Sequence, residues 1–555
     1  MEKGGRQSSS LLGKVPSSPS PIPHPRRLSV AEAPSPNALW RNLFIALIGL
    51  GIAFRIANLG MPVYWVDEVA TSMRVSGYTR GEVQALVTMG QPQSVADLQR
   101  LQTIRRDRPA TDLMRVLAKS PEHAPLYFVL ARFWAALFGT SVVAMRSLPV
   151  IFSLLGLPAI YFLGRSLFAS DGPASVQASR RGLLVGQIAV GLLAISPFFI
   201  AYAQEARPYS LWILLLLLMN QCLWRSLHNN RRLWWMGYAL TLILTLYTSL
   251  LTVLVVVAQA LWVLLFYRKR WLPYGLASGI AGIALLPWAY VVFSQLQTLQ
   301  SNTAWTQLPN PIWATMATWF YGLAVLFFDV PVSFNPLLIG LQVIAATAVV
   351  ALIVHSVWVI VRRAPRPVGS FVLAGAIAIP ALLLIVDIAR NGHSAGTPRY
   401  LMPTHLGALI ALAYLISQWL MPPETRHSAR SLAGWKKGAI SFLITVSIVS
   451  GLIMQPSPYL KSRNLSNPEL TALLNAADAP QVITTPHYIN DAISLSYGLE
   501  PDISIYFLPT ETASPAALLK QLAAKNDRRP TFLLAPSEEM LQLVTEQNLG
   551  ELTLI

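Results

Sequence analysis

The sequence contains few charged residues and almost no cysteine. Charged residues make up 12% of its 555 residues, whereas soluble globular proteins carry about 25%, which argues against a water-soluble enzyme of several domains. The single cysteine, Cys222, lies inside an apolar run, so an intrachain disulfide and a metal site built from cysteines are both excluded. The redox compartment of the protein stays open.

Long apolar runs, in contrast, are abundant, and 54% of all residues are hydrophobic. A helix needs about 20 residues to cross the roughly 30 Å of hydrocarbon in a bilayer. Eleven runs are predicted to span the membrane: 41–59, 144–164, 182–203, 208–224, 233–249, 250–267, 272–293, 336–361, 371–389, 400–420 and 437–455. A twelfth run, 124–138, is shorter and carries Arg132 in its middle, so it is predicted to lie at the membrane surface.

The positive charge of the chain follows the predicted topology. A net charge of +17 and a pI of 10.1 would suggest nucleic acid as a partner if the basic residues formed one face, but they do not. With eleven spans and a cytoplasmic N-terminus, the inner segments hold 22 Lys and Arg against four Asp and Glu. Because Lys and Arg in short loops stay on the cytoplasmic side, the charge is a topology signal and nucleic acid is not an expected partner.

The predicted fold class is a polytopic α-helical membrane protein with a small extracytoplasmic α/β domain at its C-terminus. Residues 1–37, with repeated Ser-Pro, are predicted to be a disordered cytoplasmic tail. Residues 38–455 form the membrane domain, with extracytoplasmic loops at 60–143 and 294–335. Residues 456–555 alternate between helical and extended patterns, with helices predicted at 468–477, 489–497, 515–525 and 537–546 and strands at 481–485, 503–507, 531–535 and 552–555. This tail carries no glycine-rich phosphate loop and no metal-ligand spacing. We therefore expect it to be a lid or an interaction module.

Two adjacent carboxylates, Asp67 and Glu68, follow the first span and the aromatic pair Tyr64-Trp65. An acidic pair in a loop is usually just solvated. Its place beside the membrane surface favours a second interpretation, in which a cleft excludes water and one carboxylate takes a proton from an acceptor hydroxyl. Further along this loop His123 precedes a predicted helix start, where it is either a surface histidine or a ligand for an anionic group.

Three arginines are predicted at the outer ends of spans: Arg146, Arg207 and Arg399. Taken alone, Arg146 could simply be an anchor whose charged end reaches the lipid headgroups. Arg207 could simply form an ion pair with Glu205. At a shared depth, however, guanidinium groups are suited to bidentate capture of a lipid phosphate. His355 and His405, inside spans, are predicted to be packed or hydrogen-bonded.

Five short motifs occur in register with this topology: Asp67-Glu68, His123-Ala-Pro-Leu-Tyr, Met145-Arg146-Ser-Leu-Pro, Ser196-Pro-Phe-Phe with Glu205-Ala-Arg-Pro-Tyr-Ser, and Arg399-Tyr-Leu-Met-Pro. Over about residues 41–420 the chain resembles the GT-C glycosyltransferases of the protein O-mannosyltransferase and aminoarabinose-transferase type, glycosyltransferase family 39. Its small external domain is similar to those of cyanobacterial members. The resemblance implies a bacterial inner-membrane enzyme that transfers a sugar, with inversion, from a polyprenyl-phosphate donor to an acceptor at the outer face.

The resemblance also implies roles for individual residues. Asp67 matches the acidic position taken as general base, and Glu68 matches its acidic neighbour, which is expected to bind substrate. The remaining matched positions are expected to bind substrate: His123, Tyr127, Arg146, Glu205, Arg207, Tyr209, Arg399 and Tyr400. The chain departs from the family twice, with Ala124 where relatives have proline and Ser249 where they often have histidine.

No cofactor and no metal are expected, because arginines can neutralise a departing phosphate and the outer loops show no tight carboxylate cluster. The expected partners are the polyprenyl-phosphate-linked sugar donor, a glycan, lipid or protein acceptor, and membrane lipid. A transporter or flippase for a lipid-linked sugar is the alternative. Transporters tend to carry charges near the membrane midplane, whereas here the charges gather at one face. A scaffold protein would leave the arginines unexplained.

Overall fold

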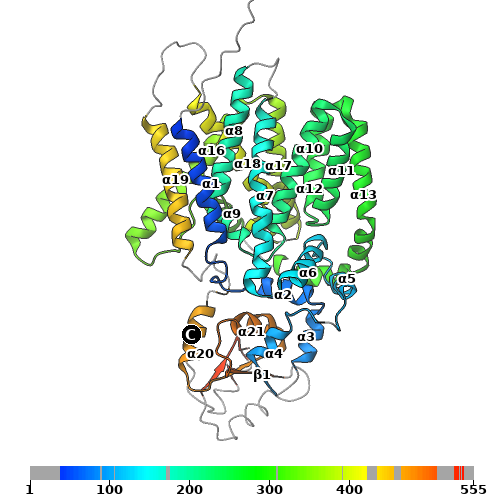
Figure 1. The fold of residues 1–555 in the computed structure, drawn as a ribbon, viewed down its shortest axis with the longest axis vertical. Helices are drawn as coiled ribbons and strands as arrows, with labels where there is room; N and C mark the ends of the chain where they lie inside the picture. Colours follow the sequence, from blue (N-terminus) through cyan, green and yellow to red (C-terminus); the bar gives the residue numbers. More distant parts are fainter. Residues whose placement is uncertain are drawn as a thin grey trace, which may run out of the picture.

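The chain forms a helical bundle with a small sheet-containing domain at one end (Figure 1). The computed structural model describes residues 38–87, 91–105, 107–169, 176–307, 311–390, 392–421, 434–455, 464, 466–508, 530–536, 538 and 541–542. The tail predicted at residues 1–37 lies outside these residues.

Seven helices of the described chain are long and apolar enough to cross a membrane. They are α7 (Val142–Ala169), α8 (Val176–Ile195), α10 (Tyr209–Asn229), α13 (Trp271–Ser294), α16 (Pro336–Arg363), α17 (Arg366–Arg390) and α19 (Gly434–Met454). The other four predicted spans coincide with the helices α1 (Ala38–Ile56), α11 (Arg232–Leu246), α12 (Thr252–Phe266) and α18 (Met402–Leu420). The prediction of a polytopic helical membrane protein is confirmed, and the count of eleven spans stays a prediction.

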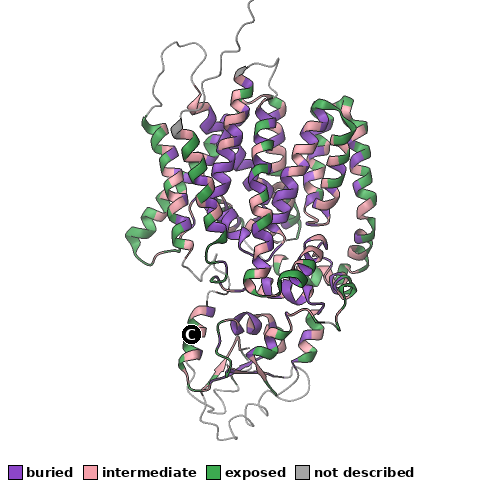
Figure 2. Ribbon diagram, in the orientation of Figure 1, coloured by how far each residue is buried: buried purple, intermediate pink, exposed green. Residues whose placement is uncertain are grey.

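The outer helices of the bundle expose apolar side chains. Along α13 the exposed positions recur every three or four residues: Leu272, Leu276, Ile280, Ile283, Leu286, Tyr290 and Phe293. This spacing places them on one face of the helix, and Figure 2 shows the exposure along the same outer helix while the inner helices are mostly buried. An apolar stripe of this length facing outward requires lipid as its solvent.

The predicted continuous span 182–203 is wrong near its end. Helix α8 ends at Ile195, and a separate helix α9 (Pro197–Ala203) begins after Ser196, which has an extended backbone. Proline has no N–H to donate to the preceding turn but fits the first position of a new helix. The hydroxyl of Ser196 donates to the carbonyl of Leu326 at 2.6 Å, so the break is tied to a distant segment.

The first loop is mostly helical. It contains α2 (Val66–Val75), α3 (Arg80–Leu86), α4 (Val95–Arg100), α5 (Ala110–Ala118) and α6 (Leu126–Phe138). At 13 residues α6 is shorter than a span, and in Figure 1 it lies beside α2 at the end of the bundle. Arg132 is buried, and its guanidinium donates to the carbonyls of Val75 and Arg108, so this charge holds α6 on the loop.

The C-terminal domain contains α20 (Asn467–Ala476), α21 (Ile489–Ser496), β2 (Gln481–Thr484), β3 (Ser504–Phe507) and β4 (Thr531–Leu533), as the sequence pattern predicted. Strand β2 pairs in parallel with both β3 and β4. The helix and strand predicted at 515–525 and 552–555, and most of the helix predicted at 537–546, lie outside the described residues.

One strand of this sheet comes from the first loop. β1 (Pro92–Ser94) pairs antiparallel with β3, with Gln93 opposite Ile505, and gives the order β1-β3-β2-β4. The loop and the tail also share an apolar core. The hydroxyl of Ser494 donates to the carbonyl of Tyr64 at 2.7 Å, and Arg80 donates to the carbonyl of His487 at 2.7 Å. The loop and the C-terminal domain therefore pack as one unit, and the predicted domain boundaries stay a prediction.

The remaining short elements lie between the longer helices and strands of the bundle and of the C-terminal domain. They are α14 (Leu296–Asn302) and α15 (Ile312–Ala324), and the 3-10 helices η1 (Arg268–Arg270), η2 (Ala304–Gln307), η3 (Ser394–Gly396), η4 (Pro398–Tyr400) and η5 (Pro486–Tyr488). The segment 294–335, predicted as an outer loop, thus holds two α-helices and a 3-10 turn.

Candidate functional site

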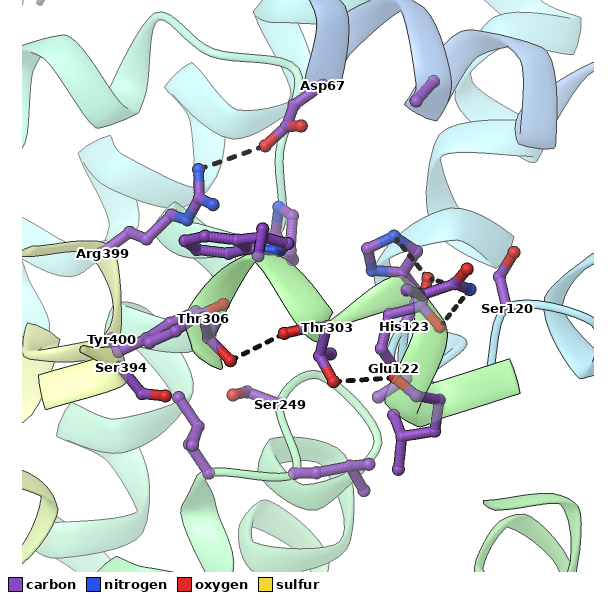
Figure 3. Close-up of a pocket in the computed structure, with 18 of the residues that line it drawn as sticks. Asp67, Ser120, Glu122, His123, Ser249, Thr303, Thr306, Ser394, Arg399 and Tyr400 are labelled. Carbon is purple, nitrogen blue, oxygen red and sulfur yellow. Dashed lines mark hydrogen bonds and ion pairs between the residues drawn. The ribbon is translucent and has the colours of Figure 1, made fainter. Parts of the chain in front are cut away.

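A cavity of about 1320 Å³ lies where the bundle, the first loop and the C-terminal domain meet. Its lining comes from α2, from the turn before α10, from α14 and η2, and from the segment between α17 and α18. His487 and Asn490 of the C-terminal domain also line it. Figure 3 shows Asp67 and Arg399 pointing toward each other on one side of this cavity, with Glu122 and His123 on another.

Helix α2 presents its two acidic residues in different directions. Both lie in the first turn, where the positive end of the helix dipole favours a carboxylate. Asp67, Ala70 and Arg74 follow the helical spacing i, i+3, i+7, so they share the face that lines the cavity. Glu68 lies on another face, where its side chain has no exposed surface.

Two guanidinium groups contact the carboxylate of Asp67. Its Oδ2 lies 3.4 Å from Nη2 of Arg207 and 3.3 Å from Nη1 of Arg399. Arg207 comes from the short turn between α9 and α10, and Arg399 from η4, 332 residues away from Asp67. Burial tends to lower the pKa of Arg399, but the nearby tyrosines and Asp67 raise it overall, so this guanidinium stays charged.

Arg146, the third predicted arginine, does not line the cavity. It forms a buried ion pair with Glu68, in which Nη2 and Nε of Arg146 lie 2.6 and 2.9 Å from the carboxylate oxygens. Its remaining donors bind the carbonyls of Leu59, Pro62 and Val63. Glu68 also accepts the backbone N–H of Ala206 at 2.8 Å. This pair therefore ties α7, the chain before α2 and the turn that carries Arg207 into one fixed arrangement.

A second polar cluster lies elsewhere in the cavity around Glu122. The amide of Asn302 donates to both of its carboxylate oxygens, at 3.2 and 3.1 Å, and Arg74 lies 4.0 Å away. His123 lies next to it, with Nε2 at 3.6 Å from Glu122, and packs against the ring of Phe128. Burial, followed by the charges of Arg74, Arg207 and Arg399, holds the pKa of His123 well below 6.5, so its ring is neutral at pH 7.

The four other predicted residues divide between the cavity and its surroundings. Tyr209 and Tyr400 line the cavity, where the guanidinium groups of Arg207 and Arg399 lie 5.7 and 5.8 Å from their ring centres. Tyr127 and Glu205 are buried outside the lining residues. Their part in substrate binding stays a prediction.

Several lining residues had no signal in the sequence. Trp305 lies under the guanidinium of Arg399 at 5.2 Å, in a position set by the fold of 294–307. Asp387 accepts the backbone N–H groups of Ser394 and Ala395, at 2.9 and 2.6 Å, and so shapes the segment that leads to Arg399. The Glu122 cluster combines segments 180 residues apart. A local sequence pattern cannot predict contacts between residues so far apart in the chain.

The cavity has a positive polar part and an apolar part. Six basic side chains face three carboxylates in its lining; they are Arg74, Arg80, Lys119, Arg207, Arg390 and Arg399 against Asp67, Glu122 and Asp387. The apolar part consists of Leu250 and Leu251 just before α12, Leu254 in its first turn, and Leu382, Leu383, Ile385 and Val386 on α17. The described residues contain no group of three or more His, Cys, Asp and Glu that could hold a metal ion.

The predicted cytoplasmic charges lie at the other end of the bundle. Helix α7 starts beside the cavity, where Arg146 binds Glu68, and reaches Arg165 about 28 Å later at 1.5 Å per residue. Helix α10 likewise runs away from Arg207 toward Arg225. The cavity and these basic residues are therefore on opposite ends of the helices.

No protein-family model matches the chain, and a comparison with curated proteins also finds no match. Among solved structures the chain is similar to ArnT from Cupriavidus metallidurans bound to undecaprenyl phosphate, with 14% identity and a TM-score of 0.45, over 92% of this chain and 88% of ArnT. It is also similar to the oligosaccharyltransferase AglB from Archaeoglobus fulgidus in complex with an inhibitory peptide and a dolichol-phosphate. That comparison has 11% identity and a TM-score of 0.42, over 84% of this chain and 64% of AglB.

Proposed function

We propose that this protein is an inverting glycosyltransferase that moves a sugar from a polyprenyl-phosphate donor to a hydroxyl or amine acceptor. The observation that supports the proposal most strongly is the contact of Asp67 with Arg207 and Arg399 inside a cavity that also has an apolar wall. A base, a phosphate-binding pair and a place for a lipid chain are the groups that this reaction needs.

The two arginines suit the phosphate of the donor. A guanidinium presents parallel N–H groups that match two phosphate oxygens and keeps its charge at any physiological pH. When the sugar leaves, negative charge develops on the phosphate oxygen, and fixed cations in a poorly hydrated cavity stabilise this charge in the transition state. The excess of basic over acidic side chains in the lining favours the same ligand.

The apolar wall suits the polyprenyl chain. Helices α12 and α17 pack against each other, and both contribute leucines to the cavity. Ile385 and Val386 also line the cavity and expose 63% and 44% of their surface. These side chains give the cavity an apolar surface beside its basic residues, which suits a lipid chain with a phosphate at its end.

Asp67 acts as the general base in this reaction. The carboxylate of Asp67 takes the proton of the acceptor hydroxyl, and the acceptor oxygen forms a bond to the anomeric carbon from the face opposite the phosphate. The bond between that carbon and the phosphate oxygen breaks, and its electron pair leaves with the polyprenyl phosphate, beside Arg207 and Arg399. Attack from the opposite face inverts the anomeric carbon. An amine acceptor would follow the same course.

The location of the cavity supports an extracytoplasmic reaction. It lies at the end of the helices opposite Arg165 and Arg225, and the positive-inside rule assigns that basic end to the cytoplasm. The C-terminal domain is then extracytoplasmic and the N-terminus cytoplasmic. Charges grouped at one end also fit an enzyme better than a transporter, whose charged groups lie near the midplane.

The test is sugar transfer by the Asp67→Asn variant. Membranes that contain the protein and the acceptors of its host are given undecaprenyl-phospho-sugars with different labelled sugars, and transfer of the label and release of undecaprenyl phosphate are measured. Loss of a general base typically costs about 10²- to 10⁴-fold in rate, so the variant is expected to lose at least about 100-fold. Asp107→Asn, an exposed position paired with Arg105, serves as the matched control.

Retained transfer in the folded Asp67→Asn variant would show that Asp67 is not the base. A wild-type protein that moves the intact lipid-linked sugar between leaflets, without releasing undecaprenyl phosphate, would instead support the transporter.

A further inference from the structure

The neighbouring carboxylates of Asp67 and Glu68 contact their arginines at different distances. Glu68 is fully buried and its oxygens lie 2.6 and 2.9 Å from the guanidinium of Arg146. Asp67 keeps 29% of its side-chain surface exposed, and its guanidinium contacts are 3.3 and 3.4 Å long. Hydrogen bonds between charged groups are normally about 2.7 to 2.9 Å. The contacts of Glu68 with Arg146 thus have the usual length for charged groups, whereas the contacts of Asp67 with Arg207 and Arg399 are longer.

The two guanidinium groups that contact Asp67 have other attachments. Nη1 of Arg207 donates to the backbone carbonyl of Asp67 at 3.2 Å and to the hydroxyl of Thr71 at 3.1 Å. Arg399 lies against the rings of Trp305 and Tyr400. Glu68 fixes the turn of Arg207 through the N–H of Ala206. Both arginines can therefore keep their positions if the Asp67 carboxylate moves away.

Arg207 and Arg399 together also have more N–H donors than one carboxylate oxygen can accept. Both contacts converge on Oδ2 of Asp67. Nε of Arg207 is buried and has no hydrogen-bond partner among the described residues. A phosphate group, with two or more oxygens around phosphorus, can bind two guanidinium groups at once with shorter hydrogen bonds.

We propose that the Asp67 carboxylate takes the phosphate-binding position beside Arg207 and Arg399 before the donor binds, and that the donor's phosphate displaces it. This inference rests on the proposed function. Displacement separates Asp67 from two positive charges that stabilise its ionised form, so its affinity for a proton increases. Asp67 therefore becomes an effective base only when the donor is in place, and donor binding is coupled to base activation without any movement of the helices.

The test is a comparison of binding affinities for undecaprenyl phosphate. Wild-type protein and Asp67→Asn are titrated with this lipid in detergent. If the carboxylate competes with the phosphate, the variant binds more tightly, by about tenfold, which corresponds to about 1.4 kcal/mol. This direction is unusual, because loss of a catalytic side chain that merely contacts the ligand weakens binding. Inorganic phosphate serves as a second probe and is expected to bind more weakly overall with the same preference for the variant.

Glu122→Gln is the matched comparison. It removes one negative charge from the same cavity, but Glu122 pairs with Arg74 and Asn302 instead of the phosphate-binding arginines. A general electrostatic effect on the cavity is expected to tighten binding by less than about twofold in this variant.

The outcomes separate the inference from the proposed function. If wild-type protein binds undecaprenyl phosphate and Asp67→Asn binds it equally or more weakly, the displacement is wrong and the proposed function stands. Two further results would overturn the displacement. One is an equal gain in affinity for undecaprenyl phosphate in Glu122→Gln. The other is an Asp67→Asn variant that binds the lipid more tightly than wild type but not inorganic phosphate. If wild-type protein binds no polyprenyl phosphate, the proposed function itself fails.

Discussion

Arg146 and Glu68 lie 78 residues apart in the sequence and form a buried ion pair with a shortest N–O distance of 2.6 Å. The pair connects the first loop to α7 and, through Ala206, to the turn that carries Arg207. Its contribution is to position the site, since neither side chain lines the cavity.

Removing one partner of this pair is expected to destabilise the protein. Arg146→Met leaves the Glu68 carboxylate buried without its cation, which typically costs about 3 to 5 kcal/mol. Thermal unfolding in detergent measures the loss. The double variant Arg146→Met with Glu68→Gln removes both charges and is expected to recover part of the stability; a double variant as unstable as the sum of the two single ones would contradict the pairing.

Replacing either cavity arginine with lysine is expected to weaken donor binding although the charge is kept. Lysine offers a point charge in place of the planar fork, and it cannot stack on Trp305 as Arg399 does. A hydrogen bond to a charged group contributes about 1.5 to 3 kcal/mol, so Arg207→Lys and Arg399→Lys should each raise the Kd for undecaprenyl phosphate by about 10- to 100-fold. Arg100→Lys, an exposed residue of α4, should bind as wild type does; equal affinities in all of these proteins would remove the arginines from the phosphate site.

Trp305 is expected to support donor binding indirectly, by holding Arg399. A cation–π contact contributes about 0.5 to 2 kcal/mol, so Trp305→Ala should raise the Kd for undecaprenyl phosphate by roughly 2- to 30-fold. Trp313 on α15 exposes 69% of its surface and lies outside the cavity lining, so Trp313→Ala provides the comparison. The role of Trp305 would be disproved by a stronger effect at Trp313.

The buried histidine predicts how stability depends on pH. The folded-state pKa of His123 is lower than its ordinary value of 6.5, because of burial and of three nearby arginines. Below pH 6.5 the unfolded chain therefore binds a proton at this position that the folded protein does not. The free energy of unfolding should fall as the pH drops below 6.5, by at most about 1.4 kcal/mol per pH unit from this group.

The measurement compares thermal unfolding of wild type and His123→Gln between pH 7.5 and 5.5. The variant, which cannot take up this proton, should show a smaller loss of stability on acidification. The same pH dependence in both proteins would show that His123 is not the group responsible.

Much of the fold follows from the sequence because membrane helices leave a strong local pattern. Apolar runs predicted the helices of the bundle, and alternating patterns predicted β2, β3 and β4. The sequence did not predict β1, because Pro92–Ser94 is only three residues long and acquires its extended form by pairing with β3. The break after Ile195 was missed because Pro197 lies inside an apolar run that continues on both sides.

The site was only partly predictable for a related reason. Positions at the outer ends of spans placed Asp67, Arg207 and Arg399 at one depth, and the structure brings these three side chains together. Depth alone does not tell which way a side chain faces around a helix. Arg146 shares the depth but turns toward Glu68, and Trp305 and Asn302 reach the cavity only through the fold of a segment without a strong pattern.

We propose above all that Arg207 and Arg399 form the binding site for the phosphate of a polyprenyl-linked sugar. Mass spectrometry of lipids that copurify with the protein tests it most directly. Wild-type protein should carry a polyprenyl phosphate or polyprenyl-phospho-sugar, and the double variant Arg207→Gln with Arg399→Gln should retain less than about a tenth of it. Ordinary phospholipids alone in the wild type, or equal retention of the polyprenyl lipid by both proteins, would contradict the claim.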